Sequence, residues 1–395
     1  CYGFDEIALV PGTITLDSTM VDTTWAIGNL TFKVPFIASA MDGVVDVTFA
    51  IAMGKLGGLA VLNLDGVQAR YDDPAEAIKQ VVQGDVEATT EIVQRLYKQP
   101  INEKLVAKRV EQIKAAGVPC AVSTIPQNAV RFGAIAQEAG ADIFVVQSTV
   151  TTARHEAKAY TPLDISRFLK SMNIPVIVGN TVTYEQSLEL MEMGIHGLLV
   201  GVGPGAACTT RGVLGVGVPQ VTATVDCAGA RDFYYKKSGR YVPIITDGGM
   251  RNGGDICKAF ACGSDAVMVG SAFAKAKEAP GRGYHWGMAY PHSSLPRGTR
   301  IYVGTSGTLE QIRFGPAQTD DGSQNLMGAI TTCMGTIGAK DIKGFQLAEI
   351  IIAPSIQTEG KIFQQVQRVG MARKGTAETP ANSRPKRTAR TLARR

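Results

Sequence analysis

Eight short runs rich in Val, Ile, Leu and Ala recur along the chain, and this repetition constrains the fold more than any other feature. Most of the runs are apolar at successive positions, without polar alternation, which is typical of parallel strands covered by helices. Helical patterns lie between them, and several end in Gly, as helix C-termini often do. The runs span residues 34–42, 58–65, 118–124, 141–149, 174–180, 197–203, 242–249 and 265–271.

The repetition predicts an α/β fold of the TIM (β/α)8 type, because such barrels need eight strand–helix units over about 250 residues. A doubly wound open sheet is the alternative, but eight parallel strands favour closure. We expect a single catalytic barrel domain over residues 1–367, with an active-site loop at 201–212 and a flap region at 282–330. The active site of such a barrel lies at the C-terminal ends of its strands.

Composition indicates a soluble globular protein, because 45% of the 395 residues are hydrophobic and 19% are charged. No apolar run approaches the roughly 20 residues of a membrane-spanning helix, and the opening CYGFDEIALVPG leads us to expect no secretion. The seven cysteines are scattered and form no Cys-x-x-Cys pair. This spread favours a reducing, cytoplasmic compartment over a disulfide framework or a structural zinc site.

The positive net charge of +5 comes from the C-terminal tail. Residues 368–395 carry nine Lys or Arg and one Glu, a balance of +8, so the rest of the chain carries −3. The tail has few apolar residues, and we expect it to be disordered. A solvated tail is the preferred interpretation of its charge, and a nucleic-acid or anionic-surface role is the less favoured one.

Glycine-bearing corners follow the last three predicted strands, at 201–208, 247–250 and 269–273. Glycine lets backbone N–H groups approach an anion closely, and helix N-termini add favourable partial charge. Phosphate often binds after strands seven and eight of a TIM barrel, so we expect a phosphorylated ligand here. Asp247 is predicted either to cap the helix that follows or to accept the hydroxyls of a ribose. The second role, beside a phosphate site, predicts a nucleoside monophosphate pocket.

Cys208 lies in the first of these corners. A lone Cys is usually a small buried hydrophobe, but beside backbone donors on an active-site loop it is a candidate nucleophile for an electrophilic purine carbon. Thr210 is a candidate to deliver or take a proton. The histidines supply no obvious base. His155 and His196 look like surface or helix-start residues, and His285 and His292 lie in a predicted loop.

The loop GPGAACTTRGVLGVGVPQ (203–220) resembles the catalytic loop of IMP dehydrogenases, and the similarity extends over residues 1–363. The opening FDEIALVPG resembles that family's FDDVLLVPG, and ASAMDGVVD resembles SAAMDTVTE. VGNTVT, ITDGGM, VMVGS and EAPG also match in order and spacing. The sister family, GMP reductase, shares the Cys-Thr-Thr loop and the barrel. It typically reads GVGYPQ where this chain reads GVGVPQ, and it lacks the EAPG of residues 278–281.

This resemblance implies NAD-dependent oxidation of inosine 5′-monophosphate (IMP) to xanthosine 5′-monophosphate (XMP), for guanine nucleotide synthesis. Cys208 would attack C2 of IMP, hydride would leave for NAD, and the covalent adduct would be hydrolysed. The implied substrate contacts are Ser39, Met41, Asn180, Gly205, Ala206, Asp247, Gly249, Gly270, Ser271, Gly287 and Met288. The implied NAD contacts are Gln147, Ser148, Thr149, Gly201 and Gly203.

The family also uses potassium, which loop carbonyls bind. The resemblance places that ion on Gly203, Gly205 and Cys208, with Glu359 and Gly360 of a neighbouring subunit completing the site. A shared site implies a homotetramer, or an octamer built from tetramers, and no membrane partner.

The family's general base is an arginine on a mobile flap, in an Arg-Tyr dipeptide that this chain lacks. The shorter segment SSLPRGTRIYVG (293–304) offers Arg297 first and Arg300 second. A free guanidinium has a pKa above ~12, so it acts as a base only with strong local perturbation or a Thr relay. The alternative is that both arginines contact phosphate or solvent.

Four positions depart from the family pattern. Ala206 stands in place of a phosphate-binding Ser, and Leu199 in place of an Arg. Gln147 replaces the Asp that contacts the nicotinamide ribose, and Val303 replaces a Gln or Glu at the purine edge. The segment 66–117 is also too short for the paired regulatory (CBS) module that most members insert. The whole pattern most resembles the short paralogue group found in cyanobacteria.

Three functions follow from these residues. We expect an IMP dehydrogenase first. A GMP reductase that consumes NADPH is the second, and a nucleotide-binding barrel without turnover is the third. The third function is favoured by the missing Arg-Tyr dipeptide and by the missing Asp that contacts the nicotinamide ribose in the family. The intact Cys-Thr-Thr loop argues against it.

Overall fold

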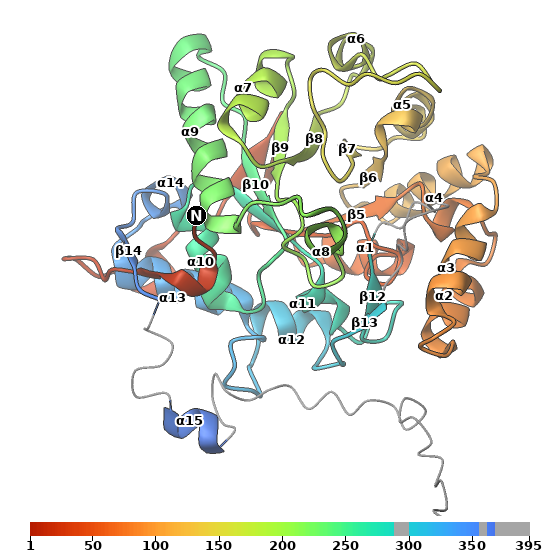
Figure 1. The fold of residues 1–395 in the computed structure, drawn as a ribbon. Helices are drawn as coiled ribbons and strands as arrows, with labels where there is room; N and C mark the ends of the chain where they lie inside the picture. The colour runs from red at the N-terminus through yellow and green to blue at the C-terminus, as the bar shows by residue number, and fades with distance from the viewer. Residues whose placement is uncertain (288–299, 355–361, 368–395) are drawn as a thin grey trace, which may run out of the picture.

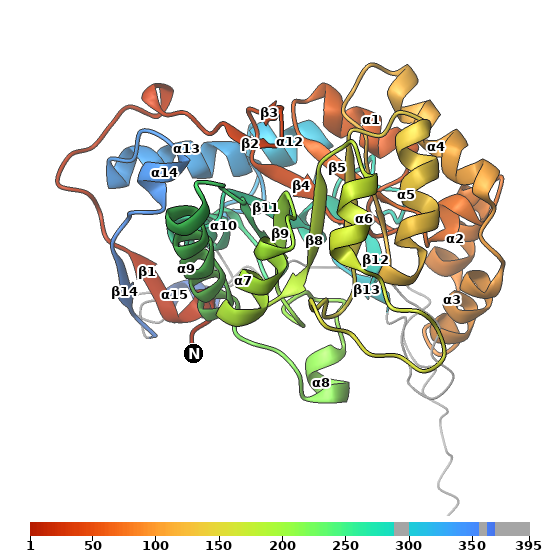
Figure 2. The same cartoon turned by 90° about the horizontal axis from the view of Figure 1, so that it is seen from above.

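The computed structural model describes residues 1–287, 300–354 and 362–367, and it contains a closed barrel of eight parallel strands. Each strand pairs with the next along the chain, and β11 closes the barrel by pairing with β4 (Figures 1 and 2). The predicted TIM barrel is therefore confirmed. The strands are β4 Phe36–Ala38, β5 Leu59–Asn63, β6 Ala121–Thr124, β7 Ile143–Gln147, β8 Val176–Thr181, β9 Gly197–Val200, β10 Ile244–Asp247 and β11 Ala266–Val269.

Helices surround the barrel and connect its strands (Figure 1). Several begin at a side chain that accepts a backbone N–H three residues later, as Asp46, Thr183 and Asn252 do. The covering helices are α1 Val47–Lys55, α4 Glu103–Ala115, α5 Ala129–Glu138, α6 Ile165–Ser171, α7 Tyr184–Glu192, α9 Gln220–Ser238, α10 Gly253–Ala261 and α11 Ser271–Ala274.

The connection from β5 to β6 is the longest of those between barrel strands. It contains α2 (Pro74–Gln83) and α3 (Thr89–Lys98), which lie outside α4 at the edge of the molecule (Figure 1). Both have a buried apolar face, and these faces pack into one cluster with Trp286. The connection is thus filled by a helical pair, in keeping with the expected lack of a CBS module.

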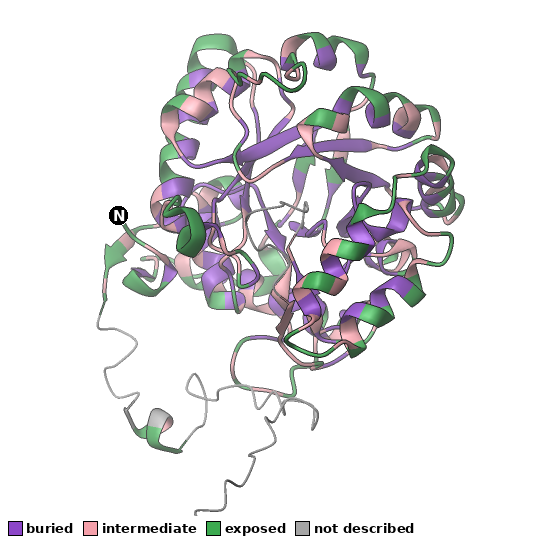
Figure 3. Ribbon diagram, turned by 45° about the vertical axis from the view of Figure 1, so that its right-hand side comes forward, coloured by how far each residue is buried: buried purple, intermediate pink, exposed green. Residues whose placement is uncertain are grey.

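Two hydrophobic layers stabilise the barrel. One lies inside it, where every strand contributes at least one buried residue, and the other lies between the strands and the helices. A hairpin of β2 (Trp25–Ile27) and β3 (Leu30–Phe32) joins the inner layer at the amino ends of the strands. Figure 3 shows the buried strands within helices that expose their outer faces.

The remaining elements flank the barrel. Two further antiparallel pairs join β1 with β14, and β12 with β13. No described helix is both long and apolar enough to span a membrane.

The predicted tail (368–395) and most of the segment 293–304 lie outside the described residues. The flanking elements are β1 Ile7–Leu9, β12 Tyr284–Trp286, β13 Arg300–Tyr302, β14 Ile350–Ile352, α8 Thr210–Leu214, α12 Leu309–Phe314, α13 Leu326–Ile337, α14 Ile342–Phe345 and α15 Ile362–Gln367. Short 3₁₀ turns cover Phe4–Glu6, Ser18–Met20, Val67–Ala69 and Pro126–Asn128.

Candidate active site

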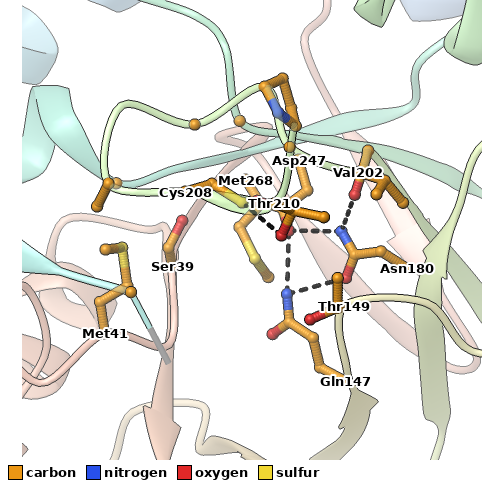
Figure 4. A pocket seen from close by; sticks show the side chains of 18 of the residues that line it. Ser39, Met41, Gln147, Thr149, Asn180, Val202, Cys208, Thr210, Asp247 and Met268 are labelled. Carbon is orange, nitrogen blue, oxygen red and sulfur yellow. Dashed lines mark hydrogen bonds between the residues drawn. The ribbon is translucent and has the colours of Figure 1, made fainter. Parts of the chain in front are cut away.

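A cavity of about 760 Å³ opens at the C-terminal ends of the barrel strands (Figure 4). Its lining comes from the ends of β4 and of β6 through β11, together with residues of β12 and Gly287. Its size lies within the range of small-molecule sites. The strand ends thus bring the predicted loop, the predicted phosphate corners and the predicted ribose contacts to one place.

The loop after β9 is held in shape by Arg211. Its Nε donates to the carbonyl of Val202 at 3.3 Å, and its Nη2 donates to the carbonyl of Val218 at 2.6 Å. Gly203 (φ +79°) packs so closely on this side chain that a Cβ there would lie 2.5 Å from Arg211 Cγ. The guanidinium therefore joins the two ends of the loop that carries Cys208.

The thiol of Cys208 is exposed and lines the cavity. Its Sγ lies 3.2 Å from Thr210 Oγ1, which it contacts as a hydrogen-bond donor (Figure 4). Three other thiols, Cys120, Cys227 and Cys262, are buried in the barrel layers, and burial raises the pKa of each to about 12. Cys208 is therefore placed for nucleophilic chemistry in a way that these thiols are not.

Asp247 lines the same cavity as Cys208 and belongs to a three-residue network (Figure 4). Its Oδ2 accepts from Asn180 Nδ2 at 2.9 Å and from Gln147 Nε2 at 3.0 Å. Burial raises the pKa of Asp247 to about 6, and the two donated hydrogen bonds oppose that rise. Asn252 caps α10, so the first predicted role of Asp247 is wrong and the carboxylate is available to a ligand.

The candidate phosphate corner is formed by the cavity residues that follow β10 and β11. Gly249 has a φ of +83°, a backbone conformation that favours glycine, and a Cβ on Gly270 would lie 2.9 Å from Met41 Sδ, so a side chain there would require Met41 to shift. Ser271 follows directly, and its Oγ lies 3.0 Å from Nε2 of His285. The prediction that His285 lies in a loop is wrong, because it is the central residue of β12.

A buried network behind this corner connects it to α3. Trp286 Nε1 donates to Tyr97 Oη at 3.0 Å, and the Tyr97 hydroxyl donates to Asp42 Oδ2. The backbone N–H of Val67 donates to the same oxygen at 2.9 Å. Burial raises the pKa of Asp42 to about 6. The network therefore holds Asp42, which follows Met41, and β12, which carries His285, in place.

Comparison with known proteins decides the family. Residues 1–293 match the model of the IMP dehydrogenase / GMP reductase domain. The chain belongs to this family. An inosine-5′-monophosphate dehydrogenase of Cryptosporidium parvum is 31% identical over 373 residues, which cover 86% of this chain and 88% of that protein.

Two further proteins are similar over nearly their whole length. An uncharacterized oxidoreductase of Mycolicibacterium smegmatis is 38% identical, over 87% of this chain and 94% of its own length. The crystal structure of an IMP dehydrogenase/GMP reductase-like protein from Corynebacterium glutamicum has a TM-score of 0.84 and 37% identity, covering 89% of this chain and 94% of that one. The predicted relationship to the short IMP dehydrogenase-like group without the CBS module is thereby supported.

Most residues that family resemblance singled out line the cavity. The implied substrate contacts among them are Ser39, Met41, Asn180, Gly205, Ala206, Asp247, Gly249, Gly270, Ser271 and Gly287, and the implied NAD contacts are Gln147, Ser148, Thr149, Gly201 and Gly203. Met288, Arg297, Glu359 and Gly360 lie outside the described residues. Sequence reasoning missed His285, Arg251 and Tyr160, which also line the cavity.

Arg300 does not lie at the cavity, so its assignment as a second candidate base is withdrawn. Its guanidinium donates to the carbonyls of Val81 and Val82 at the end of α2, and it lies 4.5 Å over the Tyr284 ring. The only signal that could have separated it from Arg297 is its place in a β-branched, aromatic run (Arg-Ile-Tyr-Val), which is typical of a strand.

Proposed function

We propose that this protein oxidises IMP to XMP with NAD as hydride acceptor. The observation that carries the proposal is the exposed thiol of Cys208 in a cavity that also holds Asp247 with Asn180 and Gln147. A nucleoside monophosphate placed between them has a nucleophile at the base and a carboxylate at the ribose.

The reaction follows from that placement. The Sγ of Cys208 forms a bond to C2 of the purine as its thiol proton departs. The C2–H bond then breaks, and its electron pair leaves as hydride, so the purine is oxidised. Water next forms the C2–O bond as the C2–S bond breaks, which releases XMP and restores the thiol. Thr210, whose hydroxyl contacts the thiol, is suited to relay a proton in the first step or the last.

NAD supplies the hydride acceptor when bound, and the residues along one wall fit a second ligand with a ring and a ribose. The Oε1 atom of Gln147 is buried without a hydrogen-bond partner among the described residues, so it is free to accept from such a ligand. Gln127 Nε2 donates to Tyr160 Oη at 3.1 Å, which places an aromatic ring at the mouth.

Potassium is the proposed second cofactor. Backbone carbonyls are ligands that suit potassium, and the loop holds those of Gly203, Gly205 and Cys208. The carbonyl of Gly205 already accepts from Cys208 N at 3.0 Å, and it has a second lone pair. The described residues hold no cluster of His, Cys, Asp and Glu suited to another metal.

Three further parts of the proposal concern the base, the assembly and the compartment. Arg297 is the candidate base for the attacking water, since Arg300 is held elsewhere. A homotetramer that shares the potassium site, and a cytoplasmic location, complete the proposal.

One assay tests the function. The protein is mixed with IMP, NAD and potassium, and reduced nicotinamide is followed by absorbance; its formation, together with XMP, is the expected result. NADPH oxidation with GMP, without NADH formation from IMP, would instead identify a reductase. Silence in both assays with IMP binding intact would identify a barrel without turnover.

A further inference from the structure

His285 is a buried histidine in the cavity wall that the proposed reaction does not use. It is 1% exposed, lines the cavity, and places its Nε2 3.0 Å from Ser271 Oγ. Its Nδ1 is buried as well and has no hydrogen-bond partner among the described residues. Because Nε2 faces Ser271, Nδ1 is the ring nitrogen at which a proton can be taken up when a bound ligand changes the charge of the cavity.

The electrostatics of this corner point to the kind of ligand. Arg251 is the only Lys or Arg among the described lining residues, and its guanidinium is already paired with Asp255 and with Asp5. A phosphate dianion at Gly270 and Ser271 would therefore lack a free cationic partner from the described part of the wall. A protonated imidazole would supply that charge through the Ser271 hydroxyl.

We propose that His285, acting through Ser271, is a positioning residue for the substrate's phosphate and takes up a proton when a phosphate monoester dianion binds. The inference rests on the proposed function, since it requires a monophosphate in this cavity. The proton comes from solvent and protonates the unoccupied imidazole nitrogen, and no bond of the substrate breaks.

The state of the free protein makes this uptake measurable. Burial lowers the pKa of His285 to about 4, so the imidazole is neutral at pH 7. A nearby dianion raises the pKa of a histidine. Binding at pH 7 then draws a proton from solvent if the pKa of His285 in the complex exceeds 7.

Other titratable groups face this corner, and their contributions differ in sign. Asp247, with a pKa of about 6, and the phosphate, with a second pKa near 6, are mostly ionised at pH 7. If Asp247 and the phosphate are fully ionised in the complex, each releases on binding the small fraction of a proton that it carries at pH 7. The remaining groups are Cys208 and Arg251 in the cavity, Asp42 and Tyr97 behind Trp286, and Arg300 on β13.

Calorimetric titration of the full-length protein with IMP, without NAD, in buffers of different ionisation enthalpy measures the protons exchanged. At pH 7 we expect net uptake of about 0.5–1 proton per IMP bound. Inosine, which lacks the phosphate, should bind more weakly and without uptake. His285→Gln keeps an amide that can hydrogen-bond Ser271 but cannot be protonated, so uptake should vanish and IMP should bind about 10-fold more weakly.

His196→Gln is the matched control. His196 is half-buried near the amino end of β9, where its Nδ1 accepts from Val176 N at 3.2 Å, a contact that Gln can replace. This variant should keep both the uptake and the affinity. If His285→Gln does not fold, as circular dichroism would show, IMP binding to the unaltered protein without proton uptake still overturns the inference.

The outcomes separate this inference from the proposed function. IMP binding without proton uptake, or unchanged uptake in His285→Gln, overturns the role of His285 and leaves IMP oxidation standing. Absence of IMP binding overturns both. Uptake with IMP but no turnover in the absorbance assay supports His285 and removes the proposed reaction.

Discussion

The two ends of the barrel are built from the same eight strands and differ in what they bury. At the amino end the β2–β3 hairpin closes the barrel with apolar side chains, and Trp25 stacks on Phe32 with ring centroids 5.2 Å apart. At the carboxyl end the strands open into a cavity lined by Asp247, Asn180 and Gln147. One end stabilises the fold and the other bears the chemistry, in agreement with the general division of TIM barrels.

The difference also appears in ionisation. Burial raises the pKa of Asp247 and Asp42 to about 6, and both lie at or directly behind the open end. At the amino end, the buried Asp265, next to the first residue of β11, is instead paired with Arg231 and Lys343. Buried carboxylates are costly in the absence of a ligand, so the open end gives up stability to keep groups ready for substrate.

The largest effect that this comparison predicts is the loss of turnover in Cys208→Ala. Because the thiol forms the covalent intermediate, we expect kcat to fall by about 10⁴-fold or more, with the melting temperature nearly unchanged. Absorbance of reduced nicotinamide and a thermal unfolding scan measure the two. Cys1→Ser, which removes the other exposed thiol, is the control and should keep full activity. A Cys208→Ala variant with unaltered kcat would contradict the role given to this end.

At the closed end, Trp25→Ala should lower the stability of the fold and leave turnover nearly unchanged. The indole is 4% exposed and its Nε1 donates to the carbonyl of Val34 at 3.1 Å, so truncation leaves a cavity and an unpaired carbonyl. We expect a loss of about 3–5 kcal/mol in the free energy of unfolding. Denaturant titration measures that loss, and kcat per folded molecule should stay within a factor of a few. A large drop in kcat without a loss of stability would break the comparison.

Asp247→Asn should weaken IMP binding by about 10- to 100-fold, because a charged acceptor for the ribose hydroxyls is replaced by a neutral amide. The ionised form of Asp247 is the binding form, and its pKa is about 6, so IMP affinity attributable to this residue is lost as pH falls through 6. Titration calorimetry from pH 5 to pH 8 gives the ratio of the IMP affinities of the unaltered protein and of Asp247→Asn. This ratio separates the contribution of Asp247 to IMP binding from that of His285. A ratio that does not change with pH would show that Asp247 does not contact the substrate in its ionised form.

The smallest predicted effect concerns Tyr97→Phe, which removes a donor to Asp42. The pKa of Asp42 is raised from 3.8 to about 6, so its contribution favours the folded state below 3.8 and is lost as pH rises through about 6. Loss of the Tyr97 hydroxyl raises that pKa further. We expect a destabilisation of about 1–2 kcal/mol at pH 8 and less at pH 5, by urea unfolding.

Tyr71→Phe is the control for that variant. The Tyr71 hydroxyl donates to the carbonyl of Leu96 at 3.0 Å, and no carboxylate depends on it. Its effect on stability should therefore be the same at both pH values. Equal losses at pH 5 and pH 8 in Tyr97→Phe would show that Asp42 does not depend on this hydroxyl.

The barrel strands could be predicted because most are apolar on both faces, a pattern that depends only on local sequence. The short helix α3 (Thr89–Lys98) was missed, since it opens with two β-branched residues and Ala88 provides no side-chain cap. The hairpin β2–β3 is also beyond local patterning. Its strands are three residues long, and what fixes them is packing against the inside of a barrel that the rest of the chain forms.

At the site, motif resemblance located Cys208 and Asp247, but not how their neighbours are held. Gln147 and Asn180 come from different strands and meet at one carboxylate oxygen. His285 looked like a loop residue because Tyr-His-Trp is too short a run to identify as a strand that pairs with Arg300–Tyr302. These contacts depend on the register of segments far apart in the sequence, which the sequence alone does not reveal.

The most direct test of the account is peptide mass mapping after rapid acid quench of the protein with IMP and NAD. If Cys208 attacks C2, the peptide that contains Cys208 should gain the mass of the oxidised purine monophosphate, and the gain should disappear in Cys208→Ala. Formation of reduced nicotinamide with an unmodified Cys208 peptide, under a quench fast enough to trap the intermediate, would contradict it.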